Sequence, residues 1–180
     1  MTTAGTLALV PVADRPDLLA EPVAKALVTW PQANTVSVAE IDPGLADTAA
    51  LVAAHGVPLD MSANCVVVAG RRGGDERVAA CVVLATTRAD VNGLVRRLLD
   101  VRKASFLAMD LAVEWTGMEY GGITPVGLPA SWSLFVDSAV AATPYVVIGS
   151  GVRRSKLALP GSALVDLPNA QVVVGLGQFA

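Results

Sequence analysis

The apolar positions of this chain recur at two spacings, and the first is typical of β-strands. From Thr35 to Ile41 apolar and polar residues alternate and β-branched side chains are frequent, which predicts a strand. Two apolar runs, 64–69 and 77–85, flank the polar, glycine-rich segment 70–76. This arrangement predicts a β-hairpin. Because neither run alternates, both faces of its strands are expected to be covered.

The second spacing, close to that of a helix, predicts helical segments. Asp42 is a suitable N-cap, Pro43 a suitable first helical residue and Gly56 a suitable end, so one helix is predicted between them. From Thr87 to Leu99 apolar residues also repeat at helical spacing. Further helical segments are predicted at 14–30 with an interruption at Pro22, at 108–116 before Gly117, and at 160–167.

Short strands complete the predicted elements. They are expected at 103–106, 134–137, 144–149, 157–159 and 171–174. Strands and helices do not alternate in a regular βαβ rhythm. We therefore predict an α+β fold in which residues 1–180 form a single compact domain with a mixed, mainly antiparallel sheet and surrounding helices.

The composition is that of a globular protein, because 53% of the 180 residues are hydrophobic and 16% are charged. The chain has no apolar run of about 18 residues, and its first residues lack the basic region of a signal peptide. A cytoplasmic protein without a membrane partner is therefore expected. Cys65 and Cys81 lie in apolar runs and are expected to be reduced thiols. With His55 as the single histidine, no metal site or cofactor is expected.

Charge is distributed unevenly along the chain. The net charge is −3, yet residues 61–103 carry eight Lys or Arg against four Asp or Glu. The overall acidity argues against duplex DNA as a partner, whereas this basic segment could contact RNA phosphates. The alternative is a solvated basic surface. The residues predicted to face RNA are Arg71, Arg72, Arg96, Arg97, Arg102 and Lys103.

The segment 116–127 is the clearest candidate for a functional loop. It reads Thr-Gly-Met-Glu-Tyr-Gly-Gly-Ile-Thr-Pro-Val-Gly, and its four glycines and one proline disfavour a helix or a central strand. Backbone with little side-chain cover can present N–H groups to an anion or a carbonyl. The alternative is a tight connection between a helix ending at Thr116 and a strand near Leu134. No nucleophile triad accompanies the loop, because the chain has one histidine.

Three segments resemble the YbaK/aminoacyl-tRNA deacylase family, which includes editing domains associated with prolyl-tRNA synthetase. The first is Gly117 with Tyr120 and the run 121–127, Gly-Gly-Ile-Thr-Pro-Val-Gly, followed by Val136-Asp137. The run 49–58, which ends in His-Gly-Val-Pro, and the run 148–154, Ile-Gly-Ser-Gly-Val-Arg-Arg, are similar to two further family elements. The resemblance covers roughly residues 43–167.

The resemblance implies a compact, barrel-like domain whose pocket holds the aminoacyl ester at the 3′ end of a tRNA. In that family the substrate's own hydroxyl or thiol, or a bound water, is thought to attack the ester. The substrate-binding residues it implies are Gly121, Gly122, Ile123, Thr124, Pro125, Gly127, Asp137, Gly149, Ser150 and Gly151. We expect the loop 121–127 to form one wall of the largest pocket.

The chain departs from the family at two candidate catalytic positions. The lysine that opens a family strand is replaced by Asn64, which keeps hydrogen-bonding capacity but loses the charge. A family carboxylate falls on Lys156. We hypothesise that Asn64 and Lys156 face each other across the pocket, so that the cation has moved from one wall to the other. The alternative is a solvated Lys156 and an Asn64 that caps a turn.

Two functions from different classes remain open. The first is a deacylase that hydrolyses the aminoacyl ester of a mischarged tRNA or a related small ester. The second is a catalytically silent relative that binds an aminoacyl or nucleotide group, or a protein partner. Retention of the glycine loop favours the first, and loss of the family lysine favours the second. The amino acid, the tRNA and the oligomeric state stay open.

Overall fold

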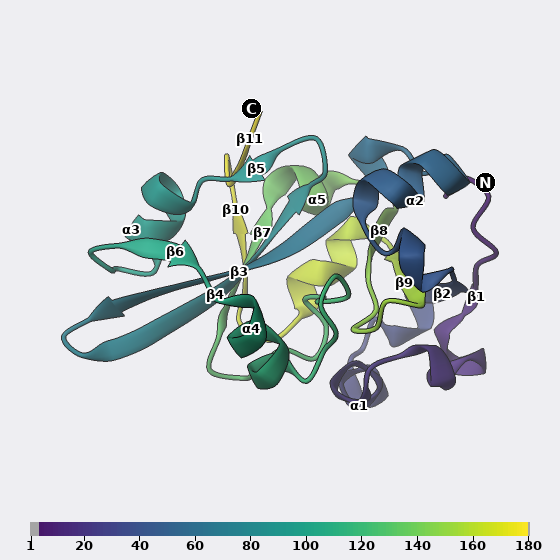
Figure 1. Cartoon of the computed structure of the whole chain (residues 1–180), viewed down its shortest axis with the longest axis horizontal. Helices are drawn as coiled ribbons and strands as arrows, with labels where there is room; N and C mark the ends of the chain where they lie inside the picture. The colour runs from purple at the N-terminus through teal and green to yellow at the C-terminus, as the bar shows by residue number, and fades with distance from the viewer. Residues whose placement is uncertain (1–3, 180) are drawn as a thin grey trace.

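A long β-hairpin lies at the centre of the fold (Figure 1). The structure, a computed structural model, describes residues 4–179. β3 (Ala63–Arg72) and β4 (Asp75–Leu84) pair antiparallel along their whole length. The chain reverses at Gly73 and Gly74, whose φ angles of 59° and 92° suit glycine. The predicted hairpin is confirmed.

The hairpin belongs to a five-stranded sheet with the order β10-β7-β4-β3-β6. β7 (Ser133–Asp137) pairs parallel with β4, and β10 (Ala170–Val173) pairs parallel with β7. β6 (Ala104–Phe106) pairs antiparallel with β3 and forms an edge of the sheet. The three short strands predicted in these regions are confirmed.

A second sheet is antiparallel throughout and has the order β1-β2-β9-β8. Its strands are β1 (Val10–Pro11), β2 (Ser37–Glu40), β8 (Val146–Gly149) and β9 (Ser155–Leu159). A bridge between Ser62 and Val147 joins its edge to the start of β3. A separate pairing links β5 (Arg88–Ala89) with β11 (Gly177–Gln178). The predicted mixed, mainly antiparallel α+β fold is confirmed, although no sheet within residues 4–179 closes into a complete barrel.

Short helices cover the sheets (Figure 1). The α-helices are α1 (Glu21–Thr29), α2 (Thr48–His55), α3 (Arg96–Leu98), α4 (Met109–Thr116) and α5 (Ser138–Ala142). 3-10 turns occupy Val12–Asp14, Pro16–Leu18, Ala33–Thr35, Pro43–Leu45, Leu59–Met61 and Gly161–Asp166, and a π-helical turn spans Val91–Val95. Among the residues that the structure describes, no helix is long and apolar enough to cross a membrane.

The helix predicted between Asp42 and Gly56 is split in two. The Asp42 carboxylate accepts a hydrogen bond of 2.8 Å from the Gly44 N–H and closes a 3-10 turn. α2 begins only at Thr48, and it ends as predicted at Gly56, whose φ is 64°. Residues 46–47 therefore lie outside any helix, and the Ala46 carbonyl is free to bind a side chain.

Two other predicted helices are also shorter than expected. Pro22 occupies the first turn of α1 and is preceded by separate 3-10 turns, so residues 14–30 are not one interrupted helix. In the segment 87–99 the Asp90 carboxylate accepts hydrogen bonds from the Gly93 and Leu94 N–H groups. This cap starts the helical turns at Val91. Arg88 and Ala89, which precede Asp90, form β5 instead.

Two apolar cores lie on opposite faces of the five-stranded sheet. The larger core packs between the two sheets and includes Val82 and Leu157, whereas the smaller core packs beneath the segment 91–101. Cys65 packs against the larger core and Cys81 belongs to the smaller one. Both cysteines are free, so the prediction of two unbridged thiols is confirmed.

Candidate functional site

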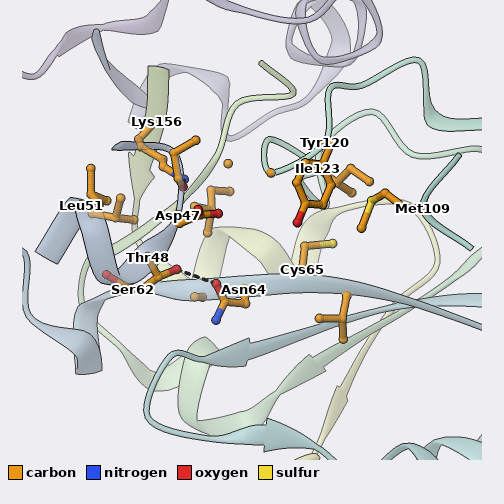
Figure 2. A pocket seen from close by; sticks show the side chains of 17 residues that line it. Asp47, Thr48, Leu51, Ser62, Asn64, Cys65, Met109, Tyr120, Ile123 and Lys156 are labelled. Atoms are coloured by element: carbon orange, nitrogen blue, oxygen red, sulfur yellow. Dashed lines mark hydrogen bonds between the residues drawn. The ribbon is translucent and has the colours of Figure 1, made fainter. Parts of the chain in front are cut away.

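A cavity of about 370 Å³ opens where the two sheets meet, beside the start of β3 (Figure 2). Two other depressions lie near the hairpin. They are more open to solvent and have volumes of about 400 and 480 Å³. The cavity at the sheet junction combines a buried charge with apolar walls, which is typical of a ligand site. Its polar lining residues are Asp47, Thr48, Ser62, Asn64, Tyr120 and Lys156, and its main apolar ones are Leu51, Cys65, Met109, Ile123, Val147 and Ile148.

Lys156 is the buried charge in this cavity. Its exposed fraction is 8%, so it is not a solvated surface lysine. Its Nζ donates a hydrogen bond of 2.7 Å to the Ala46 carbonyl, which the break before α2 leaves free. Burial lowers the pKa of Lys156 to about 8, while the Asp47 charge opposes this shift and the Arg153 charge adds to it. The ammonium group is therefore mostly protonated at pH 7, but it titrates just above neutrality.

Asn64 is the second residue of β3 and is half-buried beside the first turn of α2. The Thr48 hydroxyl donates a hydrogen bond of 2.9 Å to Asn64 Oδ1, drawn as the dashed line in Figure 2. This bond ties β3 to α2. It also fixes the orientation of the Asn64 amide.

Lys156 and Asn64 line the same cavity but bind different partners. In the view of Figure 2 Lys156 lies at the top of the cavity and Asn64 at the bottom. Their partners, Ala46 and Thr48, are two residues apart in the chain. The start of α2 therefore connects the two candidate catalytic positions.

Two glycine-rich loops cross beside the cavity. Of the residues predicted to bind substrate in these loops, Gly121, Ile123 and Gly149 line it. Gly122 and Gly151 instead bind each other, since the Gly151 N–H donates a hydrogen bond of 2.8 Å to the Gly122 carbonyl. A Cβ atom on Gly149 would lie 2.5 Å from that carbonyl oxygen, and one on Gly122 would lie 2.8 Å from the backbone of Val152. Glycine is required at these positions because the two backbones pack directly together.

The rest of the loop 121–127 lies beside a second cavity. Pro125 and Gly127 line this cavity of about 220 Å³ together with Trp30 and Trp132. Thr124 is fully buried, and its hydroxyl has no hydrogen-bond partner among the described residues. The loop is therefore divided between two cavities and does not form one continuous wall.

Asp137 and Ser150 are buried, and neither lines the cavity. The Asp137 carboxylate accepts a hydrogen bond of 2.9 Å from the Ala139 N–H at the start of α5, and it also accepts one from the Gly177 N–H. The Ser150 hydroxyl lies 2.7 Å from that of Ser155. Both side chains satisfy buried hydrogen bonds, which gives them a structural role.

Arg153 supports the cavity wall, although the sequence assigned it no role. Its guanidinium donates hydrogen bonds of 3.1 Å to the Tyr120 and Pro43 carbonyls, and it lies 5.9 Å from the centre of the Tyr120 ring. Its backbone N–H donates a hydrogen bond of 2.6 Å to the Glu119 carboxylate. Arg153 thus joins the glycine loop to the segment before α2. The two consecutive arginines after Gly151 were the only signal for it in the sequence.

The sequence also missed Asp47 and Thr48, which line the cavity from the start of α2. The sequence predicted a continuous helix over 43–55. Inside such a helix nothing distinguishes Asp47 and Thr48 as residues that line a cavity. The signal that could have found them is Pro43-Gly44, because a glycine after proline weakens a continuous helix.

The six cations predicted to face RNA do not form one surface. Arg71, Arg102 and Lys103 line a shared depression. Arg72 forms an ion pair with Asp100, and the Arg96 guanidinium donates a hydrogen bond of 2.9 Å to the Asn92 carbonyl. Arg96 and Arg97 belong to α3 and are absent from the lining of that depression.

The Cys65 thiol that lines the cavity is not an activated nucleophile. Burial raises the pKa of the Cys65 thiol far above its ordinary value, so the thiol stays protonated. Within residues 4–179 no three His, Cys, Asp or Glu side chains are grouped so that they could hold a metal ion. The groups available to a ligand are the Lys156 ammonium, hydrogen-bonding side chains and the backbone of the glycine loops.

The fold and the cavity define an α+β domain whose ligand site lies between two sheets and beside crossing glycine loops. The sequence model of the aminoacyl-tRNA editing domain matches residues 42–167, which is most of the chain. The chain therefore belongs to the aminoacyl-tRNA editing domain family.

Several solved structures share this fold. A protein described as a candidate trans-editing enzyme for prolyl-tRNA synthetase is 23% identical with a TM-score of 0.74, over 88% of this chain and 96% of that chain. A hypothetical protein has the same identity and TM-score, over 88% of this chain and 100% of its own. A candidate signal transduction protein from Marinobacter aquaeolei is 18% identical with a TM-score of 0.53, over 85% of this chain and 30% of that chain. Among curated proteins none matches the sequence.

Proposed function

We propose that this chain is a trans-editing deacylase, which hydrolyses the aminoacyl ester of a mischarged tRNA. The observation that carries the proposal is a buried lysine in the cavity of an aminoacyl-tRNA editing domain. Burying a charge is costly, and a buried ionisable group with a shifted pKa in a cleft is a candidate functional group. The proposed partner is the aminoacylated 3′ end of a tRNA.

The proposed reaction adds water to the ester carbonyl. The bond between the carbonyl carbon and the ribose oxygen breaks, and the products are the free amino acid and the tRNA hydroxyl. Negative charge develops on the carbonyl oxygen as water adds. The Lys156 ammonium is the proposed group that stabilises this charge, because its attraction is strong in a water-poor cavity.

Asn64 is proposed to position the ester rather than to carry charge. Its amide is held by Thr48 at one wall of the cavity, while Gly121 and Gly149 present backbone on other walls. The protonated Cys65 thiol is not a nucleophile. The attacking group in this proposal is therefore a water molecule.

A second function, binding without turnover, is favoured by two observations. Lys156 Nζ already donates a hydrogen bond to the Ala46 carbonyl, and the family lysine position holds Asn64. A ligand would have to share the ammonium group or displace the carbonyl. In this alternative the chain binds an aminoacyl or nucleotide group, or a protein partner, and hydrolyses nothing.

The test is single-turnover deacylation of a panel of mischarged tRNAs, with binding of the same tRNAs recorded in parallel. Lys156→Ala should lower the rate about 100-fold, which is typical for loss of one group that stabilises an oxyanion. Lys156→Arg should recover little activity, because the planar guanidinium needs a different geometry. Lys25→Ala is the matched control, since the Lys25 side chain is 74% exposed on α1 and lies outside the cavity.

Each outcome selects one interpretation. Hydrolysis that is lost in Lys156→Ala and kept in Lys25→Ala supports the deacylase with Lys156 in its proposed role. Hydrolysis that is equal in both variants contradicts the role of Lys156. Binding without hydrolysis across the panel supports the second function, and neither binding nor hydrolysis contradicts both.

A further inference from the structure

The structure contains a basic depression that the proposed hydrolysis does not use. It has a volume of about 400 Å³ and lies where β6 joins the middle of β3. Arg71, Arg102, Lys103 and Phe106 are among its lining residues. We call this feature, defined by these four residues, the hairpin groove.

Positive charge in the hairpin groove is only partly neutralised. Three cations line it together with one carboxylate, Glu76, which lies 3.9 Å from Arg71. Within residues 4–179 Arg102 and Lys103 form no ion pair. Both side chains are exposed. They can therefore bind an anion without first breaking an internal contact.

Phe106 adds an aromatic residue to the lining of the hairpin groove. It lies on the edge strand β6 opposite Val68, and its exposed fraction is 64%. An exposed aromatic ring next to cations is the combination that binds single-stranded nucleic acid, because the ring stacks on a base while the cations contact phosphates. Bases in a duplex are already stacked on each other, so a single strand fits this groove better.

Two chain segments run from the hairpin groove to the cavity that contains Lys156. On β3, Ala69 to Arg71 line the groove and Asn64 to Val66 line the cavity. At about 3.3 Å per residue the gap between Val66 and Ala69 is about 10 Å. In the second segment Leu107 and Ala108 line the groove and the next residue, Met109, lines the cavity. The two sites are therefore close to each other along β3 and at the start of α4.

We propose that the hairpin groove binds the single-stranded nucleotides next to the 3′ end whose ester occupies the cavity. Phe106 stacks on an unpaired base, and Arg71, Arg102 and Lys103 contact the adjacent phosphates. This inference rests on the proposed function, since it places a further part of the same RNA. It selects three of the six cations predicted from the sequence and adds an aromatic residue that the sequence did not single out.

The experiment measures binding of an unacylated, single-stranded RNA of about eight nucleotides that ends in CCA. The probe carries no ester, so its binding does not depend on catalysis. Phe106→Leu should weaken binding about tenfold, because it keeps an apolar side chain but loses the stacking surface. Phe179→Leu is the matched control, since Phe179 is also exposed and lies outside the groove.

A charge-matched pair of variants tests the cations. Arg102→Gln with Lys103→Gln should reduce the slope of log affinity against log salt by about 1.4, the value expected when two phosphate contacts to a single strand are lost. Arg96→Gln with Arg97→Gln removes the same charge from α3, outside the groove, and should leave the slope unchanged. Equal losses in the two double variants would overturn the inference, because they would indicate a general charge effect.

Two competitors decide the kind of ligand. A blunt RNA duplex that binds as tightly as the single strand, or polyglutamate that displaces the RNA at equal charge, would overturn the inference. Groove-dependent RNA binding without hydrolysis of any mischarged tRNA would contradict the proposed function alone. Hydrolysis of mischarged tRNA with unchanged RNA binding in Phe106→Leu would contradict this inference alone.

Discussion

The cavity at the start of β3 contains the cation Lys156, whose exposed fraction is 8% and whose ammonium binds a backbone carbonyl. Near the other end Arg102 and Lys103 are exposed and form no ion pair within the described residues. Figure 1 shows the start of β3 close to α2 and its far end at the tip of the hairpin. Lys156 therefore lies buried near the start of β3, whereas Arg102 and Lys103 lie in water beside its other half.

This difference separates two kinds of electrostatic effect. A buried charge interacts strongly with a ligand and is little affected by salt, but its pKa is shifted and it responds to pH. Solvated charges stay ionised over a wide pH range, and their attraction to an anion weakens with salt. We therefore expect the cavity to respond mainly to pH and the hairpin groove mainly to salt.

The largest expected effect is on stability as a function of pH. The folded protein releases the Lys156 proton near pH 8, whereas the unfolded chain keeps it until about pH 10.5. The unfolded state binds more protons between these values, so the free energy of unfolding should rise by about 3 kcal/mol across this window. Below about pH 8 both states are protonated and the contribution of Lys156 is constant.

Chemical denaturation at several pH values checks this prediction. Lys156→Met removes the titrating group and should abolish the rise that is specific to Lys156. The measured quantity is the difference in unfolding free energy between the native sequence and this variant. A difference that stays constant from pH 7 to pH 10 would contradict burial of the ammonium group.

The next effect concerns the glycine loops beside the cavity. Gly149→Ala should destabilise the fold by about 2 kcal/mol, because its Cβ would lie 2.5 Å from the Gly122 carbonyl oxygen. Gly73→Ala at the hairpin tip meets no atom within 4 Å and should cost only about 1 kcal/mol for its left-handed backbone. Thermal unfolding of the two variants compares steric crowding with backbone strain. Equal losses of stability in the two variants would show that the two glycine-rich loops can move apart at little cost.

A smaller effect is expected from the bond between Thr48 and Asn64. Thr48→Val keeps the shape of the side chain but removes the hydroxyl, so unfolding free energy should fall by about 1 kcal/mol. If Asn64 positions the ester, the rate of deacylation should fall as well, since the amide loses its fixed orientation. Thr29→Val on the exposed end of α1 is the control. A variant with normal stability and normal rate would exclude a positioning role for this bond.

The smallest effect on stability is expected in the hairpin groove. Arg102→Gln should change the free energy of unfolding by less than about 0.5 kcal/mol, because an exposed side chain without an ion pair contributes little. Chemical denaturation should give the same small change in the free energy of unfolding at low and at high salt. A large loss of stability would show that Arg102 is part of the fold and would break the contrast with Lys156.

Local pattern alone predicted several parts of this structure. The hairpin followed from two apolar runs around a glycine-rich turn, and the end of α4 followed from Gly117, whose φ is 66°. Asn64 and Lys156 were selected from a resemblance, and both line one cavity. By contrast, the helix expected at 43–55 is interrupted at residues 46–47, although Asp42 caps its first turn as predicted. The Ala46 carbonyl binds Lys156 from β9, and patterns of apolar residues do not report such a long-range hydrogen bond.

The sequence by itself determined the mixed α+β composition, the turns that glycine requires and the residue types available for chemistry. Only the tertiary structure decided which of them meet. The order β1-β2-β9-β8 and the bridge from Ser62 to Val147 bring Lys156 into the same cavity as Asn64 and the start of α2. The same topology makes the glycine loops pack on each other, so that the Gly151 N–H binds the Gly122 carbonyl. These contacts join residues far apart in the chain, and short-range periodicity carries no information about them.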